Sequence, residues 1–141
     1  MEIRTLDELA AEARRFVGTL VPKQEGATLV TLQGELGAGK TAFTQEVAKA
    51  LGVEEAVTSP TFVLEKIYEL SADGPYERLV HIDAYRLEGA RQLGPLGFDA
   101  LMREPTNLIM LEWPEKVAVT RADVRITLNV NDDGSRTLVY A

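Results

Sequence analysis

The sequence contains no cysteine, which excludes disulfides, thiol nucleophiles and Cys-ligated metal sites. Long apolar runs are also missing, since no stretch approaches the roughly 18 residues of a membrane span. The N-terminus is polar by Glu2 and Arg4 and does not resemble a secretion signal. Positive charge is scarce, with 15 Lys and Arg against 22 Asp and Glu and a formal net charge of −7. This balance disfavours unaided nucleic-acid binding, for which a basic patch is typical. We therefore expect a cytoplasmic protein that does not act at a membrane.

The chain of 141 residues is long enough for one domain with its own hydrophobic core, so we expect a single domain over residues 1–141. Helical periodicity follows a capping-box pattern at Thr5 and Glu8. The expected helices lie at 6–20 and 40–51, with short helical pieces at 88–102. The expected strands lie at 28–32, 62–70, 78–82 and 107–111, with a C-terminal hairpin at 124–130 and 136–140. This order predicts an α/β fold: a three-layer sandwich around a mixed sheet, with a parallel core and antiparallel C-terminal strands.

The segment that carries recognisable chemistry is residues 34–41, Gly-Glu-Leu-Gly-Ala-Gly-Lys-Thr, which match the phosphate-binding pattern G-x-x-x-x-G-K-[ST]. Its glycines permit backbone conformations that turn N–H groups around phosphate oxygens, and the following helix adds its positive dipole end. We expect Lys40 to contact the β- and γ-phosphates and Thr41 to bind Mg²⁺. The expected nucleotide-binding residues are Glu35, Leu36, Gly37, Ala38, Gly39, Lys40, Thr41 and Ala42.

Hydrolysis also requires an acidic group at the end of a neighbouring strand, where it binds the magnesium ion directly or through water. Two apolar segments end in a carboxylate: residues 79–83 end in Asp83, and residues 108–112 end in Glu112. Both are candidates, and the sequence leaves open which of them contacts the metal directly.

Four further features have both a structural and a functional interpretation. Thr58, Ser59 and Thr61 surround a proline, which is typical of a turn, but they follow the loop helix where a switch segment is expected. His81 is the only histidine, and a hydrogen-bonded structural role is favoured over that of a general base. Arg86 offers positive charge for a transition state or a surface ion pair with an acidic neighbour. Trp113 is typical of either packing or a contact surface.

The phosphate loop, Thr-Ser-Pro-Thr-Phe at 58–62, His-Ile-Asp-Ala-Tyr-Arg-Leu at 81–87 and Leu-Glu-Trp-Pro-Glu at 111–115 occur in this order. Together they resemble the TsaE (YjeE) family, the bacterial ATPase subunit of the machinery that forms threonylcarbamoyladenosine (t6A) in tRNA. The resemblance extends from the first helix to the C-terminal hairpin. It implies a P-loop NTPase-like domain that uses ATP and Mg²⁺.

The resemblance also implies partners and residue roles. The partners are a TsaB–TsaD complex, which modifies adenosine 37 of tRNAs reading ANN codons, so that tRNA contacts this chain only indirectly. The implied catalytic residues are Lys40, Asp83 and Glu112, with Thr41 and Glu112 as the metal ligands. The implied switch or partner-facing residues are Thr58, Ser59, Thr61, Tyr85, Arg86 and Trp113.

Two other functions remain open at this point. A small-molecule P-loop kinase normally has an acceptor site and an Arg-bearing lid, and no Arg-rich insertion follows the loop here. The other is a non-catalytic ATP-dependent interaction module, which the small size and acidic character of the chain would suit. A regulatory GTPase is disfavoured because no Asn-Lys-x-Asp or Thr-Lys-x-Asp segment occurs.

Overall fold

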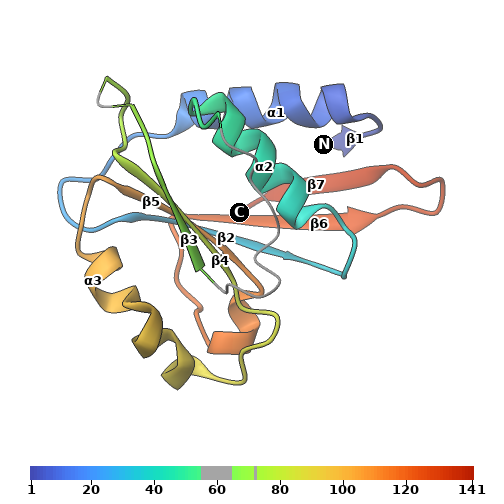
Figure 1. The fold of residues 1–141 in the computed structure, drawn as a ribbon. Helices are drawn as coiled ribbons and strands as arrows, with labels where there is room; N and C mark the ends of the chain where they lie inside the picture. Colours follow the sequence, from blue (N-terminus) through green and yellow to red (C-terminus); the bar gives the residue numbers. More distant parts are fainter. Residues whose placement is uncertain (55–64, 72) are drawn as a thin grey trace.

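The computed structural model describes residues 1–54, 65–71 and 73–141. In this part of the chain, seven strands form one mixed sheet with the order β1-β7-β6-β2-β5-β4-β3 (Figure 1). The strands are β1 (Glu2–Ile3), β2 (Thr28–Gly34), β3 (Glu65–Glu69), β4 (Arg78–Asp83), β5 (Asn107–Glu112), β6 (Val124–Val130) and β7 (Arg136–Tyr140). The helices are α1 (Leu6–Thr19), α2 (Lys40–Ala50), α3 (Phe98–Met102) and the 3₁₀ helices η1 (Ala90–Leu96) and η2 (Pro114–Val117).

The four central strands β4, β5, β2 and β6 run parallel to one another. Strands β1, β3 and β7 pair antiparallel with their neighbours at the two sides of the sheet. The predicted α/β fold with a mixed sheet and a parallel core is therefore confirmed. One detail differs: β6, the first strand of the C-terminal hairpin, belongs to the parallel core, and antiparallel pairing also occurs at β1 and β3.

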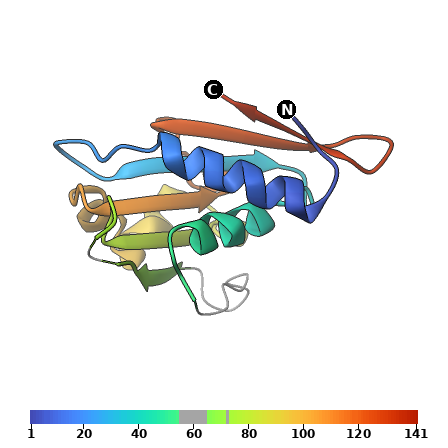
Figure 2. The same ribbon diagram turned by 90° about the horizontal axis from the view of Figure 1, so that it is seen from above.

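Helices cover both faces of the sheet, which gives the expected three layers. Helices α1 and α2 lie side by side on one face, and α3 with the 3₁₀ helices lies on the other (Figures 1 and 2). Alternate residues of strand β5 pack against the helices on opposite faces of the sheet. Leu108 and Met110 pack in the cluster under α1 and α2, whereas Ile109 and Leu111 pack in the opposite cluster. Every residue of β5 is buried, as expected for a central parallel strand.

The ends of the helices follow their local sequence. Helix α1 begins with the predicted capping box, in which the Glu8 backbone N–H donates to the Thr5 hydroxyl and the Glu8 carboxylate accepts from the Thr5 N–H. Helix α2 ends at Ala50, and Gly52 follows with φ +92°. The helical pieces expected at 88–102 are η1 and α3, which meet at Gly97 with φ +73°.

One expected strand lies partly outside the described residues, and two short elements were not expected. Strand β3 is described from Glu65 onward, so the predicted positions 62–64 lie outside the described residues. Strand β1 and helix η2 were not predicted, because two and four residues are too short to show periodicity. Among the described helices, none is long and apolar enough to cross a membrane.

The parallel core brings the ends of three strands to one edge of the sheet. Asp83 at the end of β4 pairs in register with Glu112 at the end of β5. Glu112 in turn pairs with Leu32, two residues before the end of β2. In open α/β sheets, ligands bind at the carboxyl ends of the strands. The phosphate loop, which follows β2, therefore lies beside both candidate acidic residues.

Candidate functional site

The phosphate loop joins β2 to α2 through three glycines in conformations that favour glycine. Gly34, Gly37 and Gly39 have φ values of +150°, +83° and +106°. A Cβ at Gly34 would lie only 2.3 Å from the Leu128 carbonyl oxygen, so this position also leaves no space for a side chain. Gly39 is the N-cap of α2 and provides no side-chain hydrogen bond to the helix. The N–H groups of the first turn are therefore available to an anion.

Lys40 is buried, although it carries the charge expected to meet phosphate. Its Nζ donates to the carbonyl oxygens of Gly34 at 2.6 Å and Glu35 at 2.9 Å, and it lies 4.1 Å from the centre of the Trp113 ring. Burial lowers the pKa of Lys40, and the nearby carboxylates of Glu112 and Asp83 oppose this shift. The lysine is thus held against the loop, beside two negative side chains.

Glu112 is the most enclosed acidic group of the site, with 2% of its surface exposed. The Thr41 hydroxyl donates to it and lies 3.0 Å from both carboxylate oxygens. On the side of β4, His81 Nε2 lies 2.5 Å from Glu112 Oε2. The carboxylate is therefore held between the first turn of α2 and the neighbouring strand.

Asp83 is less enclosed and has a different environment. Burial is the main cause that raises its pKa, and the negative charge of Glu112 adds to this shift. The Tyr85 backbone N–H donates to Asp83 Oδ1 at 3.0 Å. This hydrogen bond lowers the pKa of Asp83, and the charges of His81 and Lys40 lower it further. Two neighbouring carboxylates in unequal environments are a common feature of sites that handle protons or metal-bound water.

These side chains surround a cavity of about 240 Å³ at the mouth of the phosphate loop. Its lining consists of Leu36, Gly37, Gly39, Lys40, Thr41, Ala42, Asp83, Tyr85, Glu112 and Trp113. The rings of Tyr85 and Trp113 lie 5.0 Å apart at an angle of 49°. Trp113 has φ +60°, a conformation that is strained for a large side chain and is a feature of functional sites.

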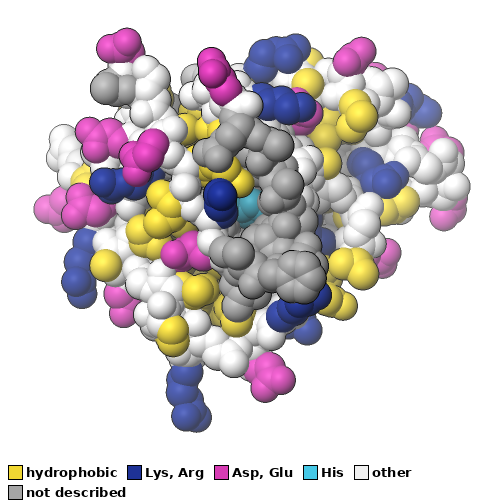
Figure 3. Space-filling view, viewed as in Figure 1, with side chains coloured by type: hydrophobic (Ala, Val, Ile, Leu, Met, Phe, Trp, Pro, Cys, Tyr) yellow, Lys and Arg dark blue, Asp and Glu magenta, His cyan; other side chains and the backbone are white. Residues whose placement is uncertain are grey.

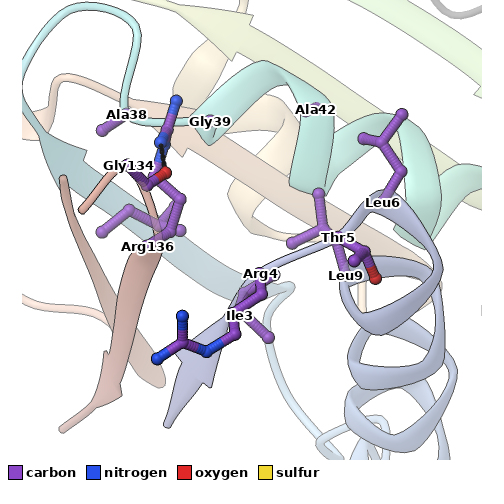
Figure 4. A pocket seen from close by; sticks show the side chains of 11 residues that line it. Ile3, Arg4, Thr5, Leu6, Leu9, Ala38, Gly39, Ala42, Gly134 and Arg136 are labelled. Carbon is purple, nitrogen blue, oxygen red and sulfur yellow. Dashed lines mark hydrogen bonds between the residues drawn. The ribbon is translucent and has the colours of Figure 1, made fainter. Parts of the chain in front are cut away.

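A second cavity, of about 310 Å³, is lined by another part of the same loop (Figure 4). Ala38, Gly39 and Ala42 form its wall on the side of the loop. Opposite them, the lining residues are Ile3, Arg4, Thr5, Leu6 and Leu9 near the N-terminus, with Leu128, Gly134 and Arg136 from the C-terminal hairpin. This cavity is more apolar than a phosphate site requires, and it shares Gly39 and Ala42 with the first cavity.

The donor groups of the first cavity fit a magnesium ion that arrives with a nucleotide. Among residues 1–54, 65–71 and 73–141, no group of three or more His, Cys, Asp or Glu side chains is arranged to hold a metal by itself. Thr41, Asp83 and Glu112 nevertheless line the cavity with hydroxyl and carboxylate oxygens. Mg²⁺ in proteins is commonly held by one or two carboxylates together with substrate phosphates and water.

Comparison with known proteins places the chain in a family. A sequence model described as "Threonylcarbamoyl adenosine biosynthesis protein TsaE" matches residues 4–138. The chain belongs to the TsaE family. A "tRNA threonylcarbamoyladenosine biosynthesis protein TsaE" from Treponema pallidum is 34% identical over 142 residues, covering 99% of this chain and 100% of the relative. The protein of that name from Streptomyces coelicolor is 41% identical over 104 residues, covering 73% and 68%.

A solved structure has a similar fold. A crystal structure of YdiB from Bacillus subtilis matches with a TM-score of 0.70 and 24% identity, covering 99% of this chain and 82% of that one. At this identity the likeness bears on the fold alone. The resemblance to the TsaE family that the four motifs indicated is confirmed.

Most of the residues predicted as sites in this TsaE-family chain lie together in the structure. All predicted nucleotide-binding residues except Glu35 and Ala38 line the 240 Å³ cavity. Glu35 contributes its carbonyl to Lys40, and Ala38 lines the second cavity. Arg86 is exposed and lies outside the lining of both cavities. Thr58, Ser59 and Thr61, predicted as a switch segment, lie outside the described residues.

Two contacts at the site were not predicted from the sequence of this TsaE-family chain: Arg136 with Gly37, and His81 with Glu112. Arg136 Nη2 donates to the Gly37 carbonyl at 3.4 Å across 99 positions of sequence. His81 was interpreted as a structural histidine, and the structure places it against Glu112. A histidine two residues before Asp83 on the same strand lies on the same face, which was the one available signal for its position.

Proposed function

We propose that this chain is a Mg²⁺-dependent ATP-binding and ATP-hydrolysing subunit that acts with TsaB and TsaD partners. Its activity is required for the formation of threonylcarbamoyladenosine at position 37 of tRNAs that read ANN codons. The observation that carries the proposal is the convergence of Lys40, Thr41 and Glu112 on one cavity beside a glycine loop, in a member of the TsaE family.

In this proposal, the nucleotide occupies both cavities, with a different part of the molecule in each. The triphosphate occupies the 240 Å³ cavity, where loop N–H groups and Lys40 meet the negative charge. The adenosine occupies the 310 Å³ cavity, whose wall carries the apolar side chains of Ile3, Leu6 and Leu9. Arg136 lies on the hairpin side of the same cavity, and its contact with Gly37 links this wall to the loop.

Binding changes the hydrogen bonds of Lys40. Its Nζ gives up the carbonyl oxygens of Gly34 and Glu35 for phosphate oxygens, which are stronger acceptors because they are charged. Contact with phosphate also favours the protonated lysine, which opposes the lowering of its pKa by burial. Trp113 lies over the ammonium group and shields it from water.

The acidic residues act on the metal and on water. Thr41 and Glu112 would hold a bound Mg²⁺ on the protein side of the cavity. The ion would supply positive charge to offset the negative charge of the transferring phosphoryl group. Asp83 lines the same cavity next to Glu112 and orders water at the second acidic position. Catalysis consists mainly of positioning and charge stabilisation.

The charge of the chain supports a role in which the partners hold the tRNA. The formal net charge is −7, and on the face seen in Figure 3 the Lys and Arg side chains are interspersed with Asp and Glu. A protein that binds nucleic acid by itself normally presents a continuous basic surface. The relatives named above are described by a tRNA modification rather than by tRNA binding.

The decisive experiment measures phosphate release and t6A formation with purified TsaB, TsaD and tRNA. Lys40→Ala and Glu112→Gln are expected to reduce ATP turnover by at least roughly 100-fold, because each removes a charge from the site. Glu104→Gln, which changes an exposed glutamate outside the lining of both cavities, is the matched control and is expected to leave turnover unchanged.

Three results contradict the proposal in different ways. Normal turnover in Glu112→Gln refutes the assignment of the metal ligand. Binding of ATP without cleavage, with partners present, favours the non-catalytic module. A phosphorylated metabolite in place of free phosphate identifies a kinase.

A further inference from the structure

The only histidine of the chain is buried at the site and has no role in the proposal above. His81 is 0% exposed and lies on β4, on the face of the sheet that α2 covers. Its Nε2 lies 2.5 Å from Glu112 Oε2. Asp83 follows two residues later on the same face of the strand. The histidine is therefore fully buried and contacts the carboxylate from the side of β4.

The direction of this hydrogen bond follows from its partner. An ionised carboxylate can only accept hydrogen bonds, so Nε2 carries the proton and donates it to Glu112 Oε2. The other ring nitrogen, Nδ1, is buried and has no hydrogen-bond partner among the described residues. The contact with Glu112 therefore uses the one ring nitrogen whose partner the structure describes.

We propose that His81 is a positioning residue, which fixes the Glu112 carboxylate in the orientation that binds the magnesium ion. This inference rests on the proposed function of the site. Two groups hold the carboxylate: Thr41 on α2 and His81 on β4. Thr41 would turn a lone pair of its hydroxyl oxygen toward a bound metal ion, whereas His81 holds the carboxylate from the side of β4. His81 thus provides a restraint that does not depend on Thr41, and it engages Oε2 of Glu112.

The position of Asp83 makes this restraint necessary. Asp83 and Glu112 are register partners at the ends of β4 and β5, and both line the cavity. Their like charges repel, and a free Glu112 side chain would turn away from Asp83. The hydrogen bond from His81 prevents that movement and keeps the carboxylates of Asp83 and Glu112 together at the cavity. Partners that orient metal-binding side chains in this way typically change metal affinity by roughly 10–100-fold.

Two substitutions separate the hydrogen bond from the bulk of the ring. In His81→Gln, the amide nitrogen reaches about the position of Nε2 and keeps a donor for Glu112. In His81→Asn, the side chain is polar but too short to reach Glu112. Trp113 is the only tryptophan and lines the cavity, so its fluorescence reports nucleotide binding without any turnover. Each protein is titrated with ATP in Mg²⁺ and again in EDTA.

The ratio of the two affinities is the quantity that tests the inference. We expect His81→Asn to lose about tenfold in ATP affinity in Mg²⁺ and to match the unsubstituted protein in EDTA. His81→Gln is expected to keep the ratio of the unsubstituted protein. A rescue by glutamine is not expected of a residue that only fills space. Because both titrations use the same protein, a change in the folded fraction cancels from the ratio.

The outcomes distinguish this inference from the proposed function. An unchanged ratio in His81→Asn overturns the positioning role, as does an equal loss in Mg²⁺ and EDTA. If the unsubstituted protein itself shows no Mg²⁺ effect on ATP binding, the proposed function fails first. Should His81→Asn not fold, as judged by thermal unfolding, His81→Met replaces it, since methionine fills the space and lacks a donor.

Discussion

Asp83 shows at the scale of one residue how the needs of the site oppose those of the fold. Burial and the neighbouring charge of Glu112 raise the pKa of its carboxyl group. The ionised form is therefore less favourable in the folded protein than in the unfolded chain. Under the proposed function, this charge is kept because the site uses it, a conflict that is common at functional sites.

Asp83→Asn is expected to stabilise the free protein and to impair turnover. The asparagine keeps an oxygen for the Tyr85 N–H and removes the repulsion, so the free energy of unfolding rises by roughly 0.5–1 kcal/mol at pH 7, a small value because the cavity is open to solvent. Since the folded pKa is raised, this gain is largest at neutral pH and disappears below about pH 4, where aspartate is protonated in both states. Urea unfolding between pH 4 and 8 tests this, and a variant that is less stable at pH 7 contradicts it.

At the scale of elements, one buried carboxylate joins α1 to β7. Glu12 is 4% exposed, accepts from Arg15 Nη2 at 2.8 Å and accepts from the Tyr140 hydroxyl at 3.0 Å. The Tyr140 ring also stacks on Phe16 at 5.6 Å. Hydrogen bonding to Arg15 is the main cause that lowers the pKa of Glu12, with Tyr140 contributing and burial opposing. These contacts link α1 to β7, the strand that contains Arg136 of the second cavity.

Glu12→Gln is expected to lower the free energy of unfolding by about 1–3 kcal/mol at neutral pH, because the arginine and the tyrosine lose a charged acceptor. A lowered folded pKa gives stability that is complete above the unfolded pKa and is lost as the pH falls through the folded pKa. The difference in free energy of unfolding between the unsubstituted protein and Glu12→Gln therefore becomes smaller below about pH 4. The matched control is Glu46→Gln, which breaks a more exposed pair with Lys49 at the same spacing and is expected to change stability little. Equal losses in the two variants would contradict the anchoring role.

At the scale of the whole molecule, the site joins elements that are distant in the sequence. The loop after β2, the ends of β4 and β5, the first turn of α2 and the C-terminal hairpin all line the two cavities. A ligand that spans both cavities bridges the N-terminal and C-terminal parts of the chain. Binding should therefore stabilise the fold as a unit.

With ATP and Mg²⁺ at 100 times the dissociation constant, the free energy of unfolding is expected to rise by about 2.7 kcal/mol. Thermal unfolding with increasing ATP measures the shift, and Lys40→Ala should abolish it. Lys49→Ala, which removes an exposed lysine from the last turn of the same helix, is expected to retain it. A shift that persists in Lys40→Ala would place the nucleotide elsewhere on the molecule.

The amino-acid sequence alone was sufficient for features that depend on nearby residues. The capping box fixed the start of α1, and the glycine loop, Lys40 and Thr41 were found because the phosphate motif is contiguous. Strand β5 was identified from its apolar run, and its final carboxylate followed from the same segment. Such signals are local because helix periodicity and loop geometry repeat within a few residues.

Only the tertiary structure decided which distant groups meet. His81 and Glu112 are 31 positions apart, and Arg136 and Gly37 are 99 apart. From the sequence, a structural role was favoured for His81, and the choice between Asp83 and Glu112 as the direct metal ligand stayed open. Contacts across a sheet depend on strand order and register, which the sequence does not show. In this protein, the sequence by itself determined the family motifs, the secondary structure of the longer elements and the position of the phosphate loop. Packing of β4 against β5 decided the environment of each carboxylate, since burial and neighbouring charge exist only after the chain has folded.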